Sequence, residues 1–175
     1  MRVVSGSAGG RRLISPEGRT TRPTSERTRE ATFNALGSLG AVVDATVVDL
    51  FAGSGALGIE ALSRGASAAT FVESDRAAIA AIHANLATCG LAQEATVVAS
   101  TVDRFLADAA RNGVRFDLAL VDPPYDFATW DDLLAAIPAD LVAAEAPSAV
   151  SAPEGWEVLR SRRYGRAWVT LLERR

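Results

Sequence analysis

The stretch from residue 46 to residue 73 constrains the fold of this chain more than any other part of its sequence. Four apolar residues within 47–51 are typical of a strand that is buried in a parallel sheet. A glycine-rich segment at residues 52–58 and a helical stretch follow, and then a second apolar run that ends in Glu73. A strand, a turn, a helix and a second strand in this order predict a βαβ unit.

The glycine spacing, Gly53-x-Gly55-x-x-Gly58, indicates a ligand site within this unit. Glycine lets a ligand approach the backbone, and the N-terminus of the following helix faces that ligand. Glu73, at the carboxyl end of the second strand, can accept hydrogen bonds from two ribose hydroxyls. Dinucleotides and S-adenosylmethionine both suit this geometry, so the segment predicts an adenosine-type cofactor and leaves the choice open. A tight turn that binds nothing is the alternative.

The length and composition of the chain narrow its class. A chain of 175 residues has room for one domain with a full core. Its only cysteine, Cys89, excludes a disulfide framework, and its only histidine, His83, leaves little for a zinc site, so we expect no metal. No apolar run reaches membrane-spanning length, and the first residues lack the apolar core of a signal peptide. We therefore expect a cytoplasmic monomer that does not bind membranes.

The arginines are concentrated at the two ends of the chain. Residues 1–30 carry seven arginines and three acidic residues, and residues 156–175 carry six and two. The middle, residues 31–155, carries five arginines and sixteen acidic residues. Basic ends on an acidic body indicate a polyanionic partner that the ends hold. Ordinary surface arginines that only face solvent are the alternative.

Hydrophobic periodicity and turn residues predict the remaining elements. We expect a β-hairpin over residues 2–15, a helix from Thr24 or Ser25 to about Leu39, helices over 75–88, 102–112 and 128–137, strands over 95–99 and 116–121, and a closing hairpin of strands 157–162 and 167–173. Residues 141–156 show strand propensity only at 149–151. Strands that alternate with helices, followed by a terminal hairpin, predict a doubly wound α/β sheet with mostly parallel strands.

The tetrapeptide Asp122-Pro123-Pro124-Tyr125 follows the predicted fourth strand, at the edge where such sheets bind ligands. Two prolines fix the backbone and remove two donors, which leaves carbonyl oxygens free to accept from an incoming amino group. An ionised Asp122 only accepts hydrogen bonds, and the ring of Tyr125 offers a face on which a base can stack. This combination predicts a site that holds an exocyclic amine against a methyl donor. A prolyl turn that caps the strand would explain the prolines alone.

These motifs together resemble those of class I S-adenosylmethionine-dependent methyltransferases that act on amino groups. The likeness rests on residues 51–55, on Glu73 and on the tetrapeptide. The patterns Arg22-Pro-Thr-x-x-Arg27-x-Arg29-Glu30-x-x-Phe33-Asn34 and Gly9-Gly10-Arg11 narrow it to a resemblance to the RsmD family, which methylates the N2 amine of a guanine in small-subunit ribosomal RNA. This resemblance extends from the first hairpin to Tyr125. It implies a seven-stranded Rossmann-like methyltransferase sheet, and 16S rRNA or the assembling small ribosomal subunit as partner.

The resemblance also implies roles for individual residues. The expected catalytic residues are Asp122, Pro123, Pro124 and Tyr125. The expected cofactor-binding residues are Asp49, Phe51, Gly53, Ser54, Gly55, Glu73, Ser74 and Thr101. Related enzymes often place Asp or Asn after the third strand to receive the adenine amine, whereas this chain has Ser100-Thr101, with Asp103 nearby.

RNA binding is expected from an N-terminal β-hairpin arm at residues 1–22 and from the start of a methyltransferase domain at residues 23–175. The arginines that we expect to contact phosphates are Arg11, Arg12, Arg22, Arg27 and Arg29. Arginine suits this role because its planar guanidinium matches phosphate oxygens. The alternative is that Arg27 and Arg29 pair with the neighbouring Glu26 and Glu30.

The hydrogen-bonding groups of guanine and adenine differ at the amine that the tetrapeptide would hold. Guanine presents two adjacent donors, N1–H and N2–H, that one carboxylate can accept, whereas adenine pairs a donor with an acceptor. Asp122 therefore favours guanine, although the same tetrapeptide occurs in adenine methyltransferases. The alternatives are an adenine-N6 methyltransferase acting on DNA or RNA, an NAD-dependent oxidoreductase, and a non-catalytic RNA-binding module of the same fold. An oxidoreductase would leave the tetrapeptide unused, and 175 residues leave no room for a DNA target-recognition domain.

Overall fold

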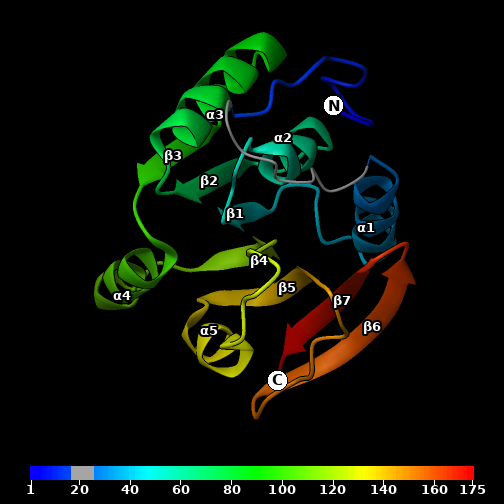
Figure 1. Cartoon of the computed structure of the whole chain (residues 1–175), viewed down its shortest axis with the longest axis vertical. Helices are drawn as coiled ribbons and strands as arrows, with labels where there is room; N and C mark the ends of the chain where they lie inside the picture. The colour runs from blue at the N-terminus through cyan, green and yellow to red at the C-terminus, as the bar shows by residue number, and fades with distance from the viewer. Residues whose placement is uncertain (17–25) are drawn as a thin grey trace.

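The chain folds around a seven-stranded sheet (Figure 1), in a computed structural model that describes residues 1–16 and 26–175. The strands are β1 (Thr46–Leu50), β2 (Ala68–Glu73), β3 (Ala95–Ala99), β4 (Phe116–Val121), β5 (Ala139–Ala146), β6 (Trp156–Tyr164) and β7 (Ala167–Arg174). Their order across the sheet is β3-β2-β1-β4-β5-β7-β6. β1 to β5 are parallel, and β7 runs antiparallel to both β5 and β6. The predicted mostly parallel sheet with an antiparallel terminal hairpin is confirmed.

Helices cover both faces of the sheet. In the described residues they are α1 (Glu26–Ser38), α2 (Ala56–Ser63), α3 (Arg76–Cys89), α4 (Val102–Asn112) and α5 (Trp130–Ala136). One apolar layer contains side chains of α1, α2 and α3, such as Ile59, and the other contains side chains of α4 and α5, such as Leu106. Val47 lies in the first layer and Val48 in the second, because successive strand side chains point to opposite faces. The doubly wound architecture is therefore confirmed.

The fifth strand is the element that the sequence pattern misplaces. The pattern indicates a strand only at residues 149–151, whereas β5 ends at Ala146 and residues 149–151 lie outside any strand. β5 is rich in alanine, a weak strand former, but it lies inside the sheet, where Ala144 is fully buried. Packing on both faces therefore outweighs propensity. Val150 is buried as part of a loop, and its N–H donates to Oγ1 of Thr170 at 3.2 Å.

The N-terminal segment, residues 1–16, forms less of a hairpin than the sequence predicts. Its only β-bridge joins Arg2 and Arg12. The N–H groups of Val4 and Ser5 donate to the Glu60 carboxylate of α2, at 2.8 and 3.1 Å. Three backbone hydrogen bonds still join the two arms of the segment, from the N–H groups of Val3, Gly10 and Leu13, so it is a short and irregular hairpin that also binds the Glu60 side chain.

Apolar contacts also fix the N-terminal segment to the domain. Val3, Ala8 and Leu13 are buried in the same apolar layer as α1, α2 and α3. Gly6 has a φ of +85°, and a Cβ on it would lie 1.7 Å from the Ser63 carbonyl oxygen, so the segment touches the backbone of α2. The predicted boundary between arm and domain, at residues 22 and 23, lies outside the described residues. No described helix is both long and apolar enough to cross a membrane.

Candidate active site

The ends of three neighbouring strands bring the predicted site residues to one edge of the sheet. Leu50 of β1 pairs with Val72 of β2 and with Val121 of β4. The residues that come next along the three strands are Phe51, Glu73 and Asp122. Adjacent strands lie about 4.8 Å apart, so the glycine-rich segment and the tetrapeptide are neighbours at the carboxyl edge.

Glu73 holds the start of the glycine-rich segment. Its Oε2 accepts a hydrogen bond from the Gly53 N–H at 2.8 Å. Its Oε1 accepts from the N–H groups of Ser74 and Asp75, at 2.8 and 2.9 Å. A carboxylate offers about four acceptor positions, so Glu73 can organise this loop and still accept from a ribose hydroxyl.

Two positions of the segment need glycine for different reasons. A Cβ on Gly53, whose φ is +57°, would have only the Phe51 carbonyl oxygen nearby, at 3.9 Å, so a ligand can approach this backbone. A Cβ on Gly58 would lie 2.3 Å from the Phe71 ring and 3.1 Å from Oδ2 of Asp49. Gly58 therefore allows α2 to pack closely on the sheet. The segment is open at its start and packed at its end, which suits an adenosine-type cofactor.

Asp49 lies buried under the glycine-rich segment, with 1% of its surface exposed. Its Oδ2 accepts a hydrogen bond from the Gly58 N–H at 2.8 Å. Burial raises the pKa of the Asp49 carboxyl well above its ordinary value; the Gly58 hydrogen bond opposes this rise, and the charges of Asp122 and Glu73 add to it. Asp49 thus supports the backbone of the cofactor loop from below.

We expect Asp49→Asn to raise the melting temperature at neutral pH, because an amide oxygen can keep the Gly58 hydrogen bond without a buried charge. The folded-state pKa is raised above the unfolded value of about 4, so the wild type loses stability as pH rises from there through the folded-state pKa. The advantage of Asn should therefore grow with pH. Thermal melts of both proteins from acidic to neutral pH measure it, with the exposed Asp126→Asn as control. A difference in melting temperature that does not change with pH would contradict a raised pKa of Asp49 in the folded protein.

Asn85 joins the glycine-rich segment to the N-terminal segment, a role that the sequence reading missed. Its buried carboxamide accepts from the Ile14 N–H at 2.8 Å and donates to the Ile14 carbonyl at 3.0 Å. The same nitrogen donates to the Ser54 carbonyl at 2.9 Å. Asn85 lies on the apolar face of α3, between the buried Ile82 and Leu86. A polar residue at an inward helical position is the signal that could have revealed it.

We expect Asn85→Leu, a change of similar volume, to weaken binding of S-adenosylmethionine about tenfold and to lower stability. The substitution leaves backbone groups of Ile14 and Ser54 without partners, at a cost of about 1–3 kcal/mol each. Calorimetric titration and urea unfolding measure the two effects. Asn112→Leu, in an exposed part of α4, should change neither. Unchanged affinity in the Asn85 variant would show that the loop holds its shape without this residue.

The tetrapeptide forms a turn directly after β4. Asp122 is half-buried, Pro123 is buried, and 59% of Tyr125 is exposed. The Phe127 N–H donates to the Pro124 carbonyl at 2.9 Å, whereas no described residue donates to the Pro123 carbonyl. The turn therefore presents a carboxylate, the Pro123 carbonyl and an exposed aromatic ring.

Aromatic packing joins this turn to the end of β1. Phe51 has a φ of +60°, a left-handed conformation that is uncommon for a residue with a side chain and is typical of functional sites. Its ring centroid lies 5.6 Å from that of Phe127, in an edge-to-face arrangement. Phe127 in turn lies 5.3 Å from Trp130, the first residue of α5. The three rings fix the geometry between the cofactor segment and the tetrapeptide.

The other predicted cofactor residues lie at the same edge. Gly55, with a φ of +76°, begins α2, and Ser74 is exposed beside Glu73. Glu73 pairs with Ala99 of β3, which brings Thr101 to this edge as well. The Thr101 hydroxyl accepts from the Arg104 N–H and caps α4.

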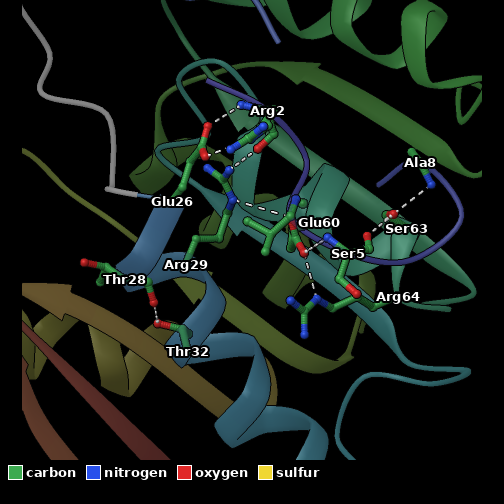
Figure 2. A network of polar contacts seen from close by, with 12 residues as sticks. Arg2, Ser5, Ala8, Glu26, Thr28, Arg29, Thr32, Glu60, Ser63 and Arg64 are labelled. Atoms are coloured by element: carbon green, nitrogen blue, oxygen red, sulfur yellow. Dashed lines mark hydrogen bonds and ion pairs between the residues drawn. The ribbon is translucent and has the colours of Figure 1, made fainter. Parts of the chain in front are cut away.

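One of the five arginines expected to bind RNA has a structural role instead. Arg29 has none of its surface exposed. Its Nη2 donates to the Arg2 carbonyl, and its Nε lies 3.5 Å from Oε2 of Glu60 (Figure 2). Arg29 therefore cannot reach an RNA phosphate, and its acidic partner is Glu60 rather than a neighbour in the sequence. The expectation for Arg29 is wrong because α1 turns this side chain toward α2.

The remaining arginines of this set differ from Arg29. Arg11, Arg12 and Arg27 are exposed, whereas Arg22 lies outside the described residues. Nη1 of Arg11 donates to the Thr88 carbonyl at 2.6 Å, near the end of α3. Neither Arg12 nor Arg27 forms an ion pair with a described residue. These exposed side chains are accessible to a polyanion such as RNA.

The parallel sheet, the glycine-rich segment after β1, the acid after β2 and the tetrapeptide after β4 define a class I Rossmann-like methyltransferase. More particularly, the chain belongs to the family described as conserved hypothetical protein 95, whose model matches residues 1–173. The resemblance drawn from the motifs is thereby confirmed.

Named relatives and solved structures agree with this placement. The chain is 45% identical over 125 residues to ribosomal RNA small subunit methyltransferase D of Escherichia coli K12; the alignment covers 71% of this chain and 60% of that protein. The protein of the same name from Haemophilus influenzae is 32% identical over 176 residues, covering 94% of this chain and 89% of the relative. A hypothetical protein of Thermus thermophilus superposes with a TM-score of 0.86 at 34% identity, over 99% of each chain.

Proposed function

We propose that this protein transfers a methyl group from S-adenosylmethionine to the exocyclic N2 amine of a guanine in 16S ribosomal RNA. The observation that carries the proposal is the juxtaposition of the cofactor segment, held by Glu73, with the turn of Asp122 and Tyr125. Two relatives that are named for methylation of small-subunit ribosomal RNA support the choice of substrate. Such a substrate belongs in the cytoplasm, and we expect the enzyme to act there as a monomer.

The charge of the site favours S-adenosylmethionine over a dinucleotide. Asp49, Glu73 and Asp122 lie close enough for the charges of the latter two to raise the pKa of Asp49. The carboxylates of Glu73 and Asp122 at this edge would repel the anionic diphosphate of NAD, whereas they attract a cationic sulfonium. When bound, S-adenosylmethionine would supply an electrophilic methyl group, and Glu73 would accept a hydrogen bond from one of its ribose hydroxyls.

The turn after β4 would hold the acceptor base. Asp122 would accept hydrogen bonds from N1–H and N2–H of guanine, and the Pro123 carbonyl would accept the second N2–H. These bonds would favour a pyramidal N2 whose lone pair is free to accept the methyl group. The methyl–sulfur bond would break as the new bond forms, S-adenosylhomocysteine would leave, and the surplus proton on N2 would pass to water. The exposed ring of Tyr125 would stack on a base turned out of its helix. Most of the acceleration would come from positioning, which can supply about 7–11 kcal/mol.

The exposed arginines of the N-terminal segment and α1 would bind the RNA backbone. Arg11, Arg12 and Arg27 are the described candidates, and Arg22 remains a candidate from the sequence alone. Phosphate contacts of this kind position an RNA without reading its sequence. Arg29 is not part of this surface, since it is buried.

Incubation with labelled S-adenosylmethionine tests the function. We expect label to enter unmodified 16S rRNA, or small subunits assembled from it, as N2-methylguanine after nucleoside digestion. N6-methyladenine would support the adenine alternative, and RNA binding without label would support the non-catalytic module. Binding of NAD with no response to S-adenosylmethionine would contradict the cofactor assignment.

A further inference from the structure

The turn of the β6–β7 hairpin lies at the same edge of the sheet as the tetrapeptide. Val121 of β4 pairs with Ala144 of β5, and the last residue of β5, Ala146, pairs with Trp168 at the start of β7. β7 runs antiparallel to β5, so the chain enters β7 at the carboxyl edge. Figure 1 shows β6 and β7 meeting at the end of the sheet near α1, away from the C-terminus. The hairpin turn and Asp122 therefore face the same side of the molecule.

Charge is distributed unevenly along this hairpin. Exposed arginines occupy its turn half: Arg166 lies in the turn, Arg162 and Arg163 lie next to it, and Arg160 lies halfway along β6. The two acids of the hairpin, Glu157 and Glu173, face each other in the register at the opposite end. Two further arginines of the chain terminus are held there, Arg174 against Trp156 and Arg175 in an ion pair with Glu157. The free positive charge of the hairpin is thus concentrated at the edge that carries the site.

Protection of an edge strand explains only part of this pattern. β6 is the last strand of the sheet, and charged side chains on such a strand prevent unwanted pairing with other chains. Arg166, however, lies in the turn and not on the free edge of β6. Edge protection also gives no reason for the arginines to gather near the active site while the acids lie at the far end.

The spacing suits a single RNA strand. β7 lies two strands from β4 and β6 lies three strands away, which corresponds to about 10 and 15 Å across the sheet. A few nucleotides beside a flipped base span such a distance.

We propose that the turn half of the β6–β7 hairpin, carrying Arg160, Arg162, Arg163 and Arg166, is an RNA-binding surface that holds phosphates next to the target guanine. The inference rests on the proposed function and adds to it a contact surface far from the N-terminal segment in the sequence. It gives the basic C-terminal end of the chain a role in substrate binding.

A triple variant, Arg160→Gln, Arg162→Gln and Arg166→Gln, tests this surface. Arg163 is left intact because its Nε donates to the Gly165 carbonyl at 3.0 Å and supports the turn. A matched control, Arg111→Gln, Arg115→Gln and Arg175→Gln, removes three exposed arginines at the opposite edge and gives the same net charge. Affinity for a 16S rRNA transcript is measured over a series of salt concentrations. S-adenosylhomocysteine binding and melting temperature are measured for all three proteins.

We expect the hairpin variant to bind the transcript on the order of 10- to 100-fold more weakly at 0.1 M salt, with a salt slope lower by about 2. The control variant should bind the transcript nearly as tightly as the wild type. Both variants should bind S-adenosylhomocysteine as tightly as the wild type. Equal RNA affinities and slopes for the two variants would overturn the hairpin surface while leaving the proposed function intact. A wild-type protein that neither binds nor methylates the RNA, free or in assembled subunits, would overturn both.

Discussion

Replacement of Asp122 by alanine should lower the rate of methyl transfer on the order of 10²–10³-fold or more, the scale on which loss of a charge-stabilising contact acts in enzymes. The reason is positional. Asp122 comes directly after Val121, which pairs with Leu50 of β1, so it lies at the same edge as the glycine-rich segment. Its carboxylate is the acceptor proposed for the guanine N1–H and N2–H. Affinity for S-adenosylhomocysteine should stay within a few-fold, because the contact proposed for Asp122 is with the base and not with the cofactor.

Two further variants test whether the effect depends on the carboxylate of Asp122. Asp122→Asn keeps one oxygen acceptor but adds an N–H donor toward the donors of guanine, so it should also be strongly impaired. Asp126→Ala removes an exposed carboxylate four residues away and should leave turnover nearly unchanged. Single-turnover rates and calorimetric titrations separate chemistry from binding. Near-normal turnover in Asp122→Ala would refute the role proposed for this carboxylate.

Loss of the Glu60 carboxylate should have the largest effect on stability, about 3–5 kcal/mol for Glu60→Ala. Glu60 is fully buried and faces the guanidinium of Arg29, which is also fully buried (Figure 2). The substitution leaves that positive charge without its acidic partner. It also removes the acceptor of the Val4 and Ser5 N–H groups and of Arg64 Nε, which donates at 2.7 Å.

Urea unfolding measures this prediction. Glu157→Ala, which breaks an exposed ion pair with Arg175, is the control and should cost less than about 1 kcal/mol. The double variant Glu60→Leu, Arg29→Met removes both buried charges and should be more stable than Glu60→Ala alone. A double variant as unstable as the single one would show that the hydrogen bonds to the N-terminal segment, and not the unpaired charge, dominate the loss.

The same network changes how the N-terminal segment must be studied. Residues 1–16 supply hydrogen-bond donors to Glu60 and apolar side chains to the core, so their deletion would disturb the domain as well as any RNA contact. Point substitutions at the exposed Arg11 and Arg12 avoid this problem. RNA recognition by the segment can thereby be separated from its structural role.

The sequence alone determined the class of fold and the place of the candidate site at the carboxyl edge of the sheet. Both depend on local features that survive any packing: a glycine where a ligand meets the backbone, an acid at a strand end, and two prolines before an aromatic residue. In a parallel sheet, strand ends meet at one edge, so Glu73 and Asp122 could be placed together before their register was known.

Only the tertiary structure decided the roles that depend on which side of an element faces inward. β5 forms because its alanines are buried between neighbouring strands, although their propensity argues against a strand. The structural roles of Asn85 and Glu60 depend on the N-terminal segment, because their side chains bind its backbone N–H groups. Arg27 and Arg29 are alike in the sequence. Because residues two positions apart on a helix point in directions about 200° apart, the Arg27 guanidinium faces solvent, whereas that of Arg29 is buried against Glu60.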